Sequence, residues 1–371
     1  MRAGLRPRPS PFVVRGKPLK FLAILTVRNE GAFLLEWLAH HKAVGFTDFL
    51  VFSNDCDDGT DKILNRLDKM GHITHIRNDG PYDKGGIQFT ALKQADKLKI
   101  VREADWILPM DVDEFVNIKV GDGTLPALLA TLPNATAITL TWRLFGNGDM
   151  VRFKDAPVTQ TFTACAPEVI QWPWRASMFK TLYANNGIYK KVGVHRPRSP
   201  DEDKLDQARW FDCEGRELDN KFKTKRLFSN FGRPNYAYAQ LNHYPLGAME
   251  SYVMKADRGR AVHSEHILGL DYWVERNFNA DQDTSIQRMH AASDAIVTEL
   301  RSDNQLDKLH KSAVQWRHTR FEELMLLEPF RALFGRLLMA SPTRPVSQKA
   351  ASFMIQFANK ARAARGKNTP N

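Results

Sequence analysis

Two carboxylates two residues apart, Asp111 and Asp113, follow a short apolar run at 106–110. If that run forms a strand of an open α/β sheet, both side chains emerge at the edge where such sheets bind ligands. Their hard oxygen atoms suit Mg²⁺ or Mn²⁺, and an ion held there can neutralise the charge of a departing diphosphate. An isolated Asp-x-Asp pattern is more often a solvated turn or a cap, so this acidic pair needs support from its surroundings.

The surroundings of the acidic pair alternate between apolar runs and helical patterns. The apolar runs lie at 21–27, 49–53, 73–76 and 106–110, with helical patterns between them at 34–44, 62–70 and 89–101. Such alternation predicts an α/β fold with a parallel sheet and right-handed connections. A further strand is expected at 137–144, an irregular α+β section follows it, and helices predominate from Ser251 onward.

Composition and charge narrow the class of protein. The 371 residues are 43% hydrophobic and 26% charged, which is typical of globular proteins in water. No run of about 20 apolar residues predicts a membrane-spanning helix, and the amino terminus lacks the apolar core of a secretory signal. We therefore expect a cytoplasmic location. The formal net charge of +11 indicates anionic partners such as nucleic acid, a membrane surface or phosphorylated molecules.

The carboxyl-terminal stretch at 321–365 has apolar residues at helical spacing, and no acidic residue follows Glu328. These two features are typical of a basic amphipathic element that lies on the inner face of a membrane. Helices packed on the main domain, with a basic tail, explain the same pattern equally well.

Three sequence blocks place the acidic pair in a wider pattern. They cover residues 23–30, 51–60 and 106–115, and each joins an expected strand to the turn that follows it. In this order the blocks resemble the GT-A glycosyltransferases of the family 2-like and family 92-like group. The resemblance implies a Rossmann-like α/β fold of GT-A type, with a mixed, mainly parallel sheet flanked by helices, and a nucleotide-sugar donor.

The resemblance also implies roles for the turns after the first two strands. Arg28 and Glu30 would face the nucleotide, and Glu30 would accept hydrogen bonds from ribose or base. Asn54 and Asp55 would hydrogen-bond the base. For Asp55, ordinary turn and capping chemistry is an equally good explanation.

Lys84 and the two glycines after it follow the third expected strand. Glycines there let backbone amides approach a phosphate while the lysine adds positive charge. A relaxed turn before a helix is the simpler interpretation of the same residues.

Later blocks extend the resemblance to about residue 280. His243 is expected to complete the metal site of Asp111 and Asp113, with a buried histidine bonded to backbone as an equal alternative. His195 would contact the diphosphate or the acceptor. Two further cations, Lys255 and Arg258, would clamp phosphate groups.

Transfer with inversion, which the resemblance implies, requires a carboxylate base near the acceptor hydroxyl. The candidates in the middle section are Glu168, Asp201, Glu202, Asp203 and Asp212. Asp212 is preferred because a sugar can stack on neighbouring Trp210. The predicted catalytic residues are Asp212 and Glu168.

The sequence therefore predicts a glycosyltransferase that depends on Mn²⁺ or Mg²⁺ and takes its sugar from a nucleotide-sugar, preferably a UDP-sugar. The acceptor would be a glycan, a lipid-linked molecule or a protein, as in polysaccharide biosynthesis, and no nucleic-acid partner is expected. A metal-dependent phosphoesterase, or a basic module that binds membranes or nucleic acid, are the alternatives. Three units are expected along the chain: a basic leader at 1–18, a catalytic domain at 19–280 and a helical basic extension at 281–371. The catalytic domain would consist of a nucleotide-sugar half (19–118) and an acceptor half (119–280).

Overall fold

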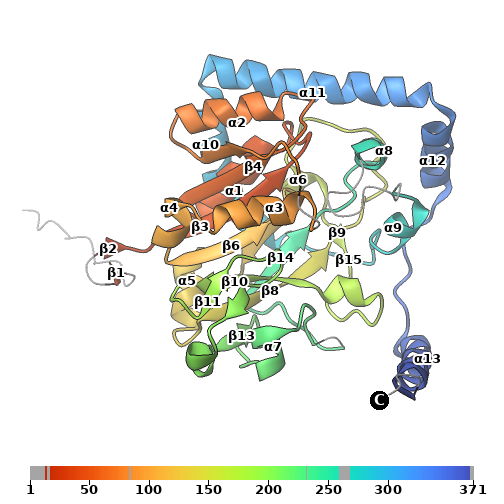
Figure 1. Ribbon diagram of the computed structural model, residues 1–371. Helices are drawn as coiled ribbons and strands as arrows, with labels where there is room; N and C mark the ends of the chain where they lie inside the picture. Colours follow the sequence, from red (N-terminus) through yellow and green to blue (C-terminus); the bar gives the residue numbers. More distant parts are fainter. Residues whose placement is uncertain (1–12, 15–16, 83–84, 231, 259–267, 368–371) are drawn as a thin grey trace, which may run out of the picture.

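A computed structural model of the chain describes residues 13–14, 17–82, 85–230, 232–258 and 268–367 (Figure 1). Its centre is a nine-stranded sheet in which the order along the main path is β5-β4-β3-β6-β10-β8-β14-β7, with β13 beside β8. The strands are β3 (Phe21–Val27), β4 (Asp48–Ser53), β5 (Thr74–Arg77), β6 (Trp106–Met110), β7 (Glu114–Ile118), β8 (Ala137–Leu144), β10 (Phe179–Ala184), β13 (Trp210–Asp212) and β14 (Ala239–His243).

The pairing of the strands divides the sheet into two parts. The first four strands along the path, β5, β4, β3 and β6, are all parallel, as the alternating sequence pattern predicted. Beyond β6, β10 pairs antiparallel with both β6 and β8, and β7 pairs antiparallel with β14, while β13 and β14 run parallel to β8. The predicted mixed, mainly parallel sheet flanked by helices is confirmed.

Both faces of the sheet are buried, and β3 shows why its sequence is apolar throughout. Successive side chains of a strand point to opposite faces. Phe21, Ala23 and Leu25 belong to one apolar core cluster, whereas Leu22 and Ile24 belong to another on the opposite face. Five helices follow or separate the first strands: α1 (Leu34–Val44), α2 (Thr60–Lys69), α3 (Ile87–Ala95), α4 (Lys99–Glu103) and α5 (Leu125–Thr131).

Short elements occupy the connections of the middle section and the amino-terminal end. They are β1 (Val13–Val14), β2 (Lys17–Pro18), α6 (Val158–Thr161), β9 (Ala164–Cys165), η1 (Trp174–Ser177), β11 (Tyr189–Lys191), β12 (Arg198–Pro200), η2 (Glu202–Gln207), α7 (Asn220–Thr224), β15 (Asp281–Gln282) and η3 (Ser285–Met289), where η marks a 3₁₀ helix. The predicted leader at 1–18 falls mostly outside the described residues.

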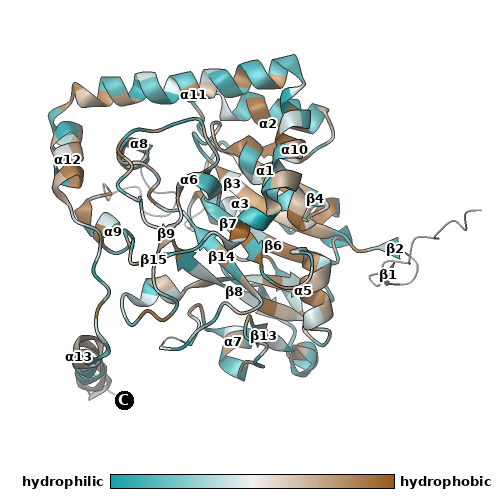
Figure 2. Ribbon diagram, turned by 180° about the vertical axis from the view of Figure 1, so that it is seen from behind, coloured by the Kyte–Doolittle hydropathy of each residue, from teal (hydrophilic) through white to brown (hydrophobic). Residues whose placement is uncertain are grey.

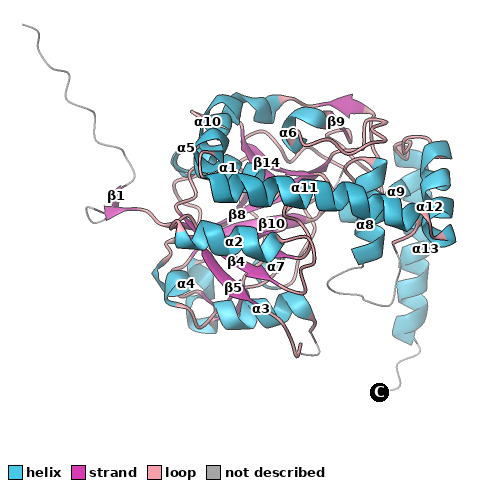
Figure 3. Ribbon diagram, turned by 90° about the horizontal axis from the view of Figure 1, so that it is seen from above, coloured by secondary structure: helices cyan, strands magenta, loops and turns pink. Residues whose placement is uncertain are grey.

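Helices predominate after β14, as expected. They are α8 (Met249–Arg258), α9 (Leu270–Val274), α10 (His290–Arg301), α11 (Asn304–Met325), α12 (Glu328–Met339) and α13 (Gln348–Lys367). The long helix α11 crosses one side of the molecule and contacts α2, α8, α10 and α12 (Figures 1 and 3). Its buried residues Leu306 and Ala313 belong to the main core, so the region after residue 280 is packed onto the sheet domain at least through α11. The predicted boundary at 280 stays a prediction.

None of the helices in the described ranges is long and apolar enough to cross a membrane.

Candidate functional site

A cavity lies at the carboxyl ends of β3, β4 and β6, where the sequence predicted ligand binding. We call it the polar cavity. It is lined by eight of the predicted site residues, together with other residues such as Gln88, Trp142 and Tyr272. The eight are Arg28, Glu30, Asn54, Asp111, Asp113, His243, Lys255 and Arg258.

Asp111 follows β6 directly, and its carboxylate is already bonded within the protein. One oxygen accepts a hydrogen bond from Gln88 Nε2 at 3.1 Å, and the other accepts from Lys180 Nζ at 3.0 Å. The Lys180 side chain is fully buried and also lies 3.6 Å from a carboxylate oxygen of Glu114. Burial lowers the pKa of Lys180, but the carboxylates of Asp111 and Glu114 outweigh this effect and hold it above its usual value. Lys180 therefore keeps its positive charge beneath the cavity.

Glu114 fixes the turn that carries the acidic pair. Its carboxylate is completely buried, and one oxygen accepts from the backbone N–H of Asp111 at 2.8 Å. The other oxygen accepts from the indole N–H of Trp142 on β8 at 2.7 Å. A buried carboxylate needs such partners because its desolvation is unfavourable. Glu114 thus ties the turn between β6 and β7 to the neighbouring strand β8.

Asp113 stands opposite a lysine and a histidine. One of its carboxylate oxygens accepts from Lys255 Nζ at 2.8 Å, and the other lies 3.6 Å from His243 Nε2. Burial raises the pKa of Asp113, but Lys255 and His243 outweigh burial and hold it well below its usual value. Burial also lowers the pKa of His243, which favours the neutral imidazole that a metal ion requires.

The fit of these residues to a divalent ion depends on Asp113 and His243. No group of three or more His, Cys, Asp or Glu side chains is arranged around one point in the part of the chain that the structure describes. Asp113 and His243 nevertheless line the same cavity, and the buried Nδ1 atom of His243 has no hydrogen-bond partner. Two protein ligands suit an Mg²⁺ or Mn²⁺ ion whose remaining ligands are phosphate oxygens and water. The residues therefore fit an ion that arrives with a diphosphate.

The turn after β3 also joins the polar cavity. The Arg258 guanidinium forms an ion pair with Glu30 and donates to the carbonyl of Arg28 at 2.8 Å. The side chain of Arg28 in turn donates to the carbonyl of Asp55 at 3.1 Å, which links the turns after β3 and β4. Glu30, predicted to bind ribose or base, is thus engaged by an arginine that was predicted to bind phosphate.

The two predicted base-binding residues differ in their placement. Asn54 is 3% exposed and lines the polar cavity. Asp55 is exposed, and its carboxylate accepts hydrogen bonds from Tyr82 OH at 2.8 Å and from Asn54 Nδ2 at 3.2 Å. We conclude that Asp55 orients Asn54. The neighbouring Asp58 accepts from the backbone N–H groups of Gly31 and Thr60, and it thereby holds together the turn after β3 and the start of α2.

Among the remaining predicted residues, the described His195 does not line the polar cavity. The ring of His195 lies beside that of Trp142, with its Nδ1 atom 3.0 Å from the carbonyl of Phe179. Burial lowers the pKa of His195 to about 4. Lys84 lies outside the described residues.

The two predicted catalytic carboxylates also lie away from the cavity. The buried Asp212 closes a turn, because its carboxylate accepts from the side chain of Arg216 at 2.8 Å and from two backbone N–H groups at 3.0 Å. The side chain of Glu168 is 56% exposed and lies 3.7 Å from Arg143. The carboxylates that do line the polar cavity are Glu30, Asp111 and Asp113.

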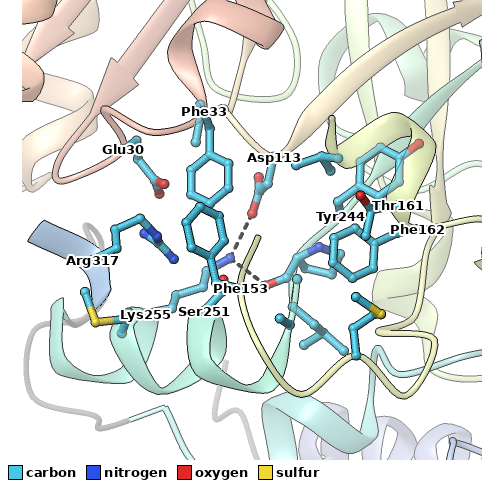
Figure 4. A pocket seen from close by; sticks show the side chains of 18 of the residues that line it. Glu30, Phe33, Asp113, Phe153, Thr161, Phe162, Tyr244, Ser251, Lys255 and Arg317 are labelled. Atoms are coloured by element: carbon cyan, nitrogen blue, oxygen red, sulfur yellow. Dashed lines mark hydrogen bonds and ion pairs between the residues drawn. The ribbon is translucent and has the colours of Figure 1, made fainter. Parts of the chain in front are cut away.

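A second cavity adjoins the polar one and shares the residues Glu30, Val112, Asp113, Lys255 and Arg258 with it. We call it the apolar cavity and the five shared residues the common wall. Its other lining residues are mainly aromatic and aliphatic, among them Phe33, Phe153, Phe162, Tyr244, Met150, Met254, Leu246 and Trp316 (Figure 4). These residues come from the start of α1, the chain after β8, the segment between β14 and α8, α8 itself and α11, and no role was predicted for them from the sequence.

Comparison with known proteins shows which family part of this chain resembles. Residues 26–202 match the sequence profile described as Glycosyltransferase family 92. This segment of the chain is therefore similar to glycosyltransferase family 92. A "Glycosyltransferase family 92 protein" of Oryza sativa subsp. japonica is 26% identical over 150 residues, which are 38% of this chain and 24% of that relative. One of Ricinus communis is 25% identical over 115 residues, which are 30% of this chain and 20% of that relative. The aligned part thus spans about a quarter or less of these relatives' length.

Among solved structures, residues 1–349 of S. aureus TarS are 14% identical, with a TM-score of 0.31 over 81% of this chain and 92% of that one. TarS has also been solved in complex with UDP, and that structure is 17% identical, again with a TM-score of 0.31 and the same coverage. The family 92-like segment supplies the strand ends of the polar cavity. His243, Lys255, Arg258 and the α11 residues of the apolar cavity lie beyond its match at 202.

Proposed function

We propose that the protein transfers a sugar from a nucleotide-sugar donor, with a UDP-sugar as the expected donor, bound in the polar cavity. The observation that carries the proposal is the position of Asp113 in the common wall of the two cavities, between Lys255 and His243. A donor in the polar cavity and an acceptor in the apolar cavity would meet at this carboxylate. The family 92-like sequence supports the same reaction class.

The donor would lie across the strand ends. Its nucleoside would reach the turn of Asn54, and its diphosphate would lie near Lys255 and Arg258, whose charges suit phosphate oxygens. Lys180 would act from beneath, because it neutralises Asp111 and so reduces repulsion between that carboxylate and the diphosphate. Glu114 would hold the turn in place during the reaction.

A divalent ion, Mn²⁺ or Mg²⁺, would be held by Asp113 and His243. When bound, such an ion supplies a Lewis acid that neutralises charge on the departing diphosphate. With the ion in place, the ammonium group of Lys255 would be able to donate to phosphate oxygens as well as to Asp113. In this proposal the metal dependence that the sequence predicts depends on the side chains of Asp113 and His243.

The transfer itself is proposed to be a single displacement with inversion. The oxygen of the acceptor hydroxyl forms a bond to the anomeric carbon, while the bond from that carbon to the diphosphate oxygen breaks and its electron pair leaves with the diphosphate. The hydroxyl proton passes to a carboxylate. Because Asp212 and Glu168 lie away from both cavities and Asp113 would hold the ion, we propose Glu30 of the common wall for this role.

An assay of nucleotide release tests the proposal without knowledge of the acceptor. Purified protein is incubated with UDP-glucose, UDP-galactose, UDP-N-acetylglucosamine and GDP-mannose in the presence of Mn²⁺, and released nucleoside diphosphate is measured. We expect slow hydrolysis of one UDP-sugar by the wild type and loss of this hydrolysis in Asp113→Asn. Equal release by wild type and variant would contradict the proposal.

We further propose that the carboxyl-terminal helices attach the protein to an anionic membrane surface on the cytoplasmic side. Several apolar side chains of α12 and α13 are exposed, including Leu338 (52%), Met339 (79%) and Phe353 (61%). Apolar and hydrophilic residues lie side by side on these helices (Figure 2), and all eight charged residues after Glu328 are basic. Both helices lie at the same end of the molecule as α8 and α9 (Figures 1 and 3).

Vesicle flotation tests the membrane proposal. Binding to vesicles with an anionic lipid fraction should fall strongly in Phe353→Ser/Phe357→Ser, because two exposed apolar anchors are lost. The matched control is Ser352→Ala, which changes an exposed polar residue of the same helix. Equal flotation of the wild type and the double variant would contradict the proposal. Binding of the wild type to neutral vesicles that equals its binding to anionic vesicles would also contradict it.

A further inference from the structure

The apolar cavity contains one buried cation whose surroundings differ from those of its neighbours. Arg317, on α11, is only 6% exposed, and its guanidinium lies 4.6 Å from the ring centre of Phe33 and 4.8 Å from that of Phe153. Its Nε atom is buried and has no hydrogen-bond partner, and no described carboxylate forms an ion pair with it. Figure 4 shows the side chain pointing toward Phe33 and Phe153, whose rings meet edge to face.

Three of the other four cations that line this cavity are already engaged, and the fourth, Lys154, is exposed to solvent. Lys255 donates to Asp113 and to the carbonyl of Pro245, Arg258 pairs with Glu30, and Arg152 pairs with Glu250. Their charges are therefore balanced within the protein. Arg317 lies against the faces of two aromatic rings, and the carboxylates of Glu30, Asp58 and Glu250 favour its charge only from beyond ion-pair distance. Such contacts supply less stabilisation than an ion pair in a buried site.

A buried guanidinium without an acceptor indicates a missing anion. Burying an unpaired charge is unfavourable, and burial here lowers the pKa of Arg317 to about 10, which still leaves it charged at neutral pH. Its planar N–H groups match the oxygens of a carboxylate or phosphate, which they can bind in pairs. The rest of the cavity offers aromatic and aliphatic surface, which suits an apolar group.

We propose that the acceptor is amphiphilic: it places an apolar group against Phe33, Phe153 and Phe162 and an anionic group on Arg317. This inference rests on the proposed function, since Asp113 of the common wall is where the acceptor hydroxyl would react. The anion is a phosphate or a carboxylate, and the apolar group is an aliphatic chain or ring. Neutral, fully polar acceptors would leave Arg317 unpaired and the aromatic walls exposed to water.

Binding of small amphiphiles tests the inference without any sugar transfer. We would titrate octyl phosphate, octanoate, neutral octyl glucoside and inorganic phosphate into the full-length wild type by calorimetry, below their micelle concentrations. Octyl phosphate or octanoate should bind more tightly than octyl glucoside and than inorganic phosphate, because only these two probes satisfy both parts of the cavity. The tighter of the two identifies the anion. Equal binding of octyl phosphate, octanoate and octyl glucoside would overturn the inference.

Variants locate the binding at Arg317. Arg317→Met keeps much of the length and the apolar contacts of the side chain but removes the charge. It should lower the affinity for the anionic probes by about 10-fold to 100-fold and leave the affinity for octyl glucoside unchanged. The matched control is Lys311→Met on the same helix, which removes an equal charge from a side chain that is 65% exposed. An unchanged affinity in Arg317→Met would overturn the inference.

A parallel titration with UDP separates this inference from the proposed donor site. Protein that binds UDP but none of the octyl anions would overturn the amphiphilic acceptor alone. Protein that binds octyl phosphate through Arg317 but no nucleotide would overturn the donor proposal and leave the anion site established. If Arg317→Met does not fold, the comparison of the four probes on the wild type still decides the inference.

Discussion

The polar and apolar cavities share a wall but are built in different ways. In the polar cavity, carboxylates and cations are paired with each other, as in Asp111 with Lys180 and Asp113 with Lys255. In the apolar cavity, aromatic rings form most of the surface and the buried cation Arg317 has no anion. The first cavity is therefore electrostatically complete before a ligand binds, whereas the second is not.

This difference has a consequence for ligand binding. A phosphate that enters the polar cavity must take partners from existing ion pairs, so its affinity depends on an added cation. An anion that enters the apolar cavity gains a partner that no protein group competes for. We expect substitutions in the polar cavity to affect both folding and donor binding, and substitutions in the apolar cavity to affect acceptor binding alone.

The largest effect is expected from Lys180→Met. This change leaves the carboxylates of Asp111 and Glu114 close together without their buried cation, and should lower the free energy of unfolding by about 3–5 kcal/mol. Urea denaturation measures the loss. The double variant Lys180→Met/Glu114→Gln should recover part of it because one of the two carboxylates is gone. A single variant as stable as the wild type would show that the ion pairs do not support this cavity.

Asp113→Asn should have the next largest effect, on catalysis. The change keeps the shape of the side chain but removes the charge from the common wall, and we expect kcat/KM for UDP-sugar turnover to fall by about 10²-fold to 10³-fold. Asp206→Asn, at an exposed acid on η2, is the matched control and should retain full turnover. Equal activity of both variants would remove Asp113 from the reaction.

Phe153→Ala tests the apolar side of the comparison. The ring lines the apolar cavity, and its loss should weaken acceptor or octyl phosphate binding by about 1.5–3 kcal/mol. UDP affinity should not change, because Phe153 does not line the polar cavity. Calorimetry on the same preparation measures both affinities, and a parallel loss of UDP binding would show that the two cavities are not independent.

The smallest effect is expected from Tyr82→Phe. The variant loses the hydrogen bond of 2.8 Å to Asp55, which orients Asn54 at the nucleoside end of the polar cavity. One such bond contributes about 0.5–1.5 kcal/mol, so UDP affinity should fall only a few-fold. A loss of UDP affinity as large as the loss in Asp113→Asn would mean that Asp55 itself contacts the nucleotide.

The sequence predicted the polar cavity better than the apolar one, for physical reasons. Parallel strands of an α/β sheet present their carboxyl ends at one edge, so Arg28, Asn54 and Asp111 could be placed together from local patterns alone. Lys180 lies in one of the later blocks of the resemblance, but no role was predicted for it. β10 enters the sheet antiparallel between β6 and β8, and pairing between such distant segments cannot be inferred from local patterns.

The general base and the apolar cavity have weaker signals in the sequence. Asp212 was attractive because it neighbours Trp210, but Arg216 and two backbone N–H groups account for its burial. Arg317 lies within an ordinary helical pattern of α11, and only its contacts with Phe33 and Phe153 show that it is buried. A charged residue in a helix is normally a solvated one, so its sequence gave no reason to select it.

Calorimetric titration of UDP and GDP tests the central claim, that the polar cavity binds a nucleotide-sugar through Asp113 and a divalent ion. The titration would be performed on the wild type with Mn²⁺, on the wild type with a chelator, and on Asp113→Asn with Mn²⁺. We expect UDP to bind to the wild type with Mn²⁺, and we expect the chelator and the substitution each to lower the UDP affinity by at least about 10-fold. UDP affinity that is unchanged by both, or no nucleotide binding by folded wild type, would contradict the claim.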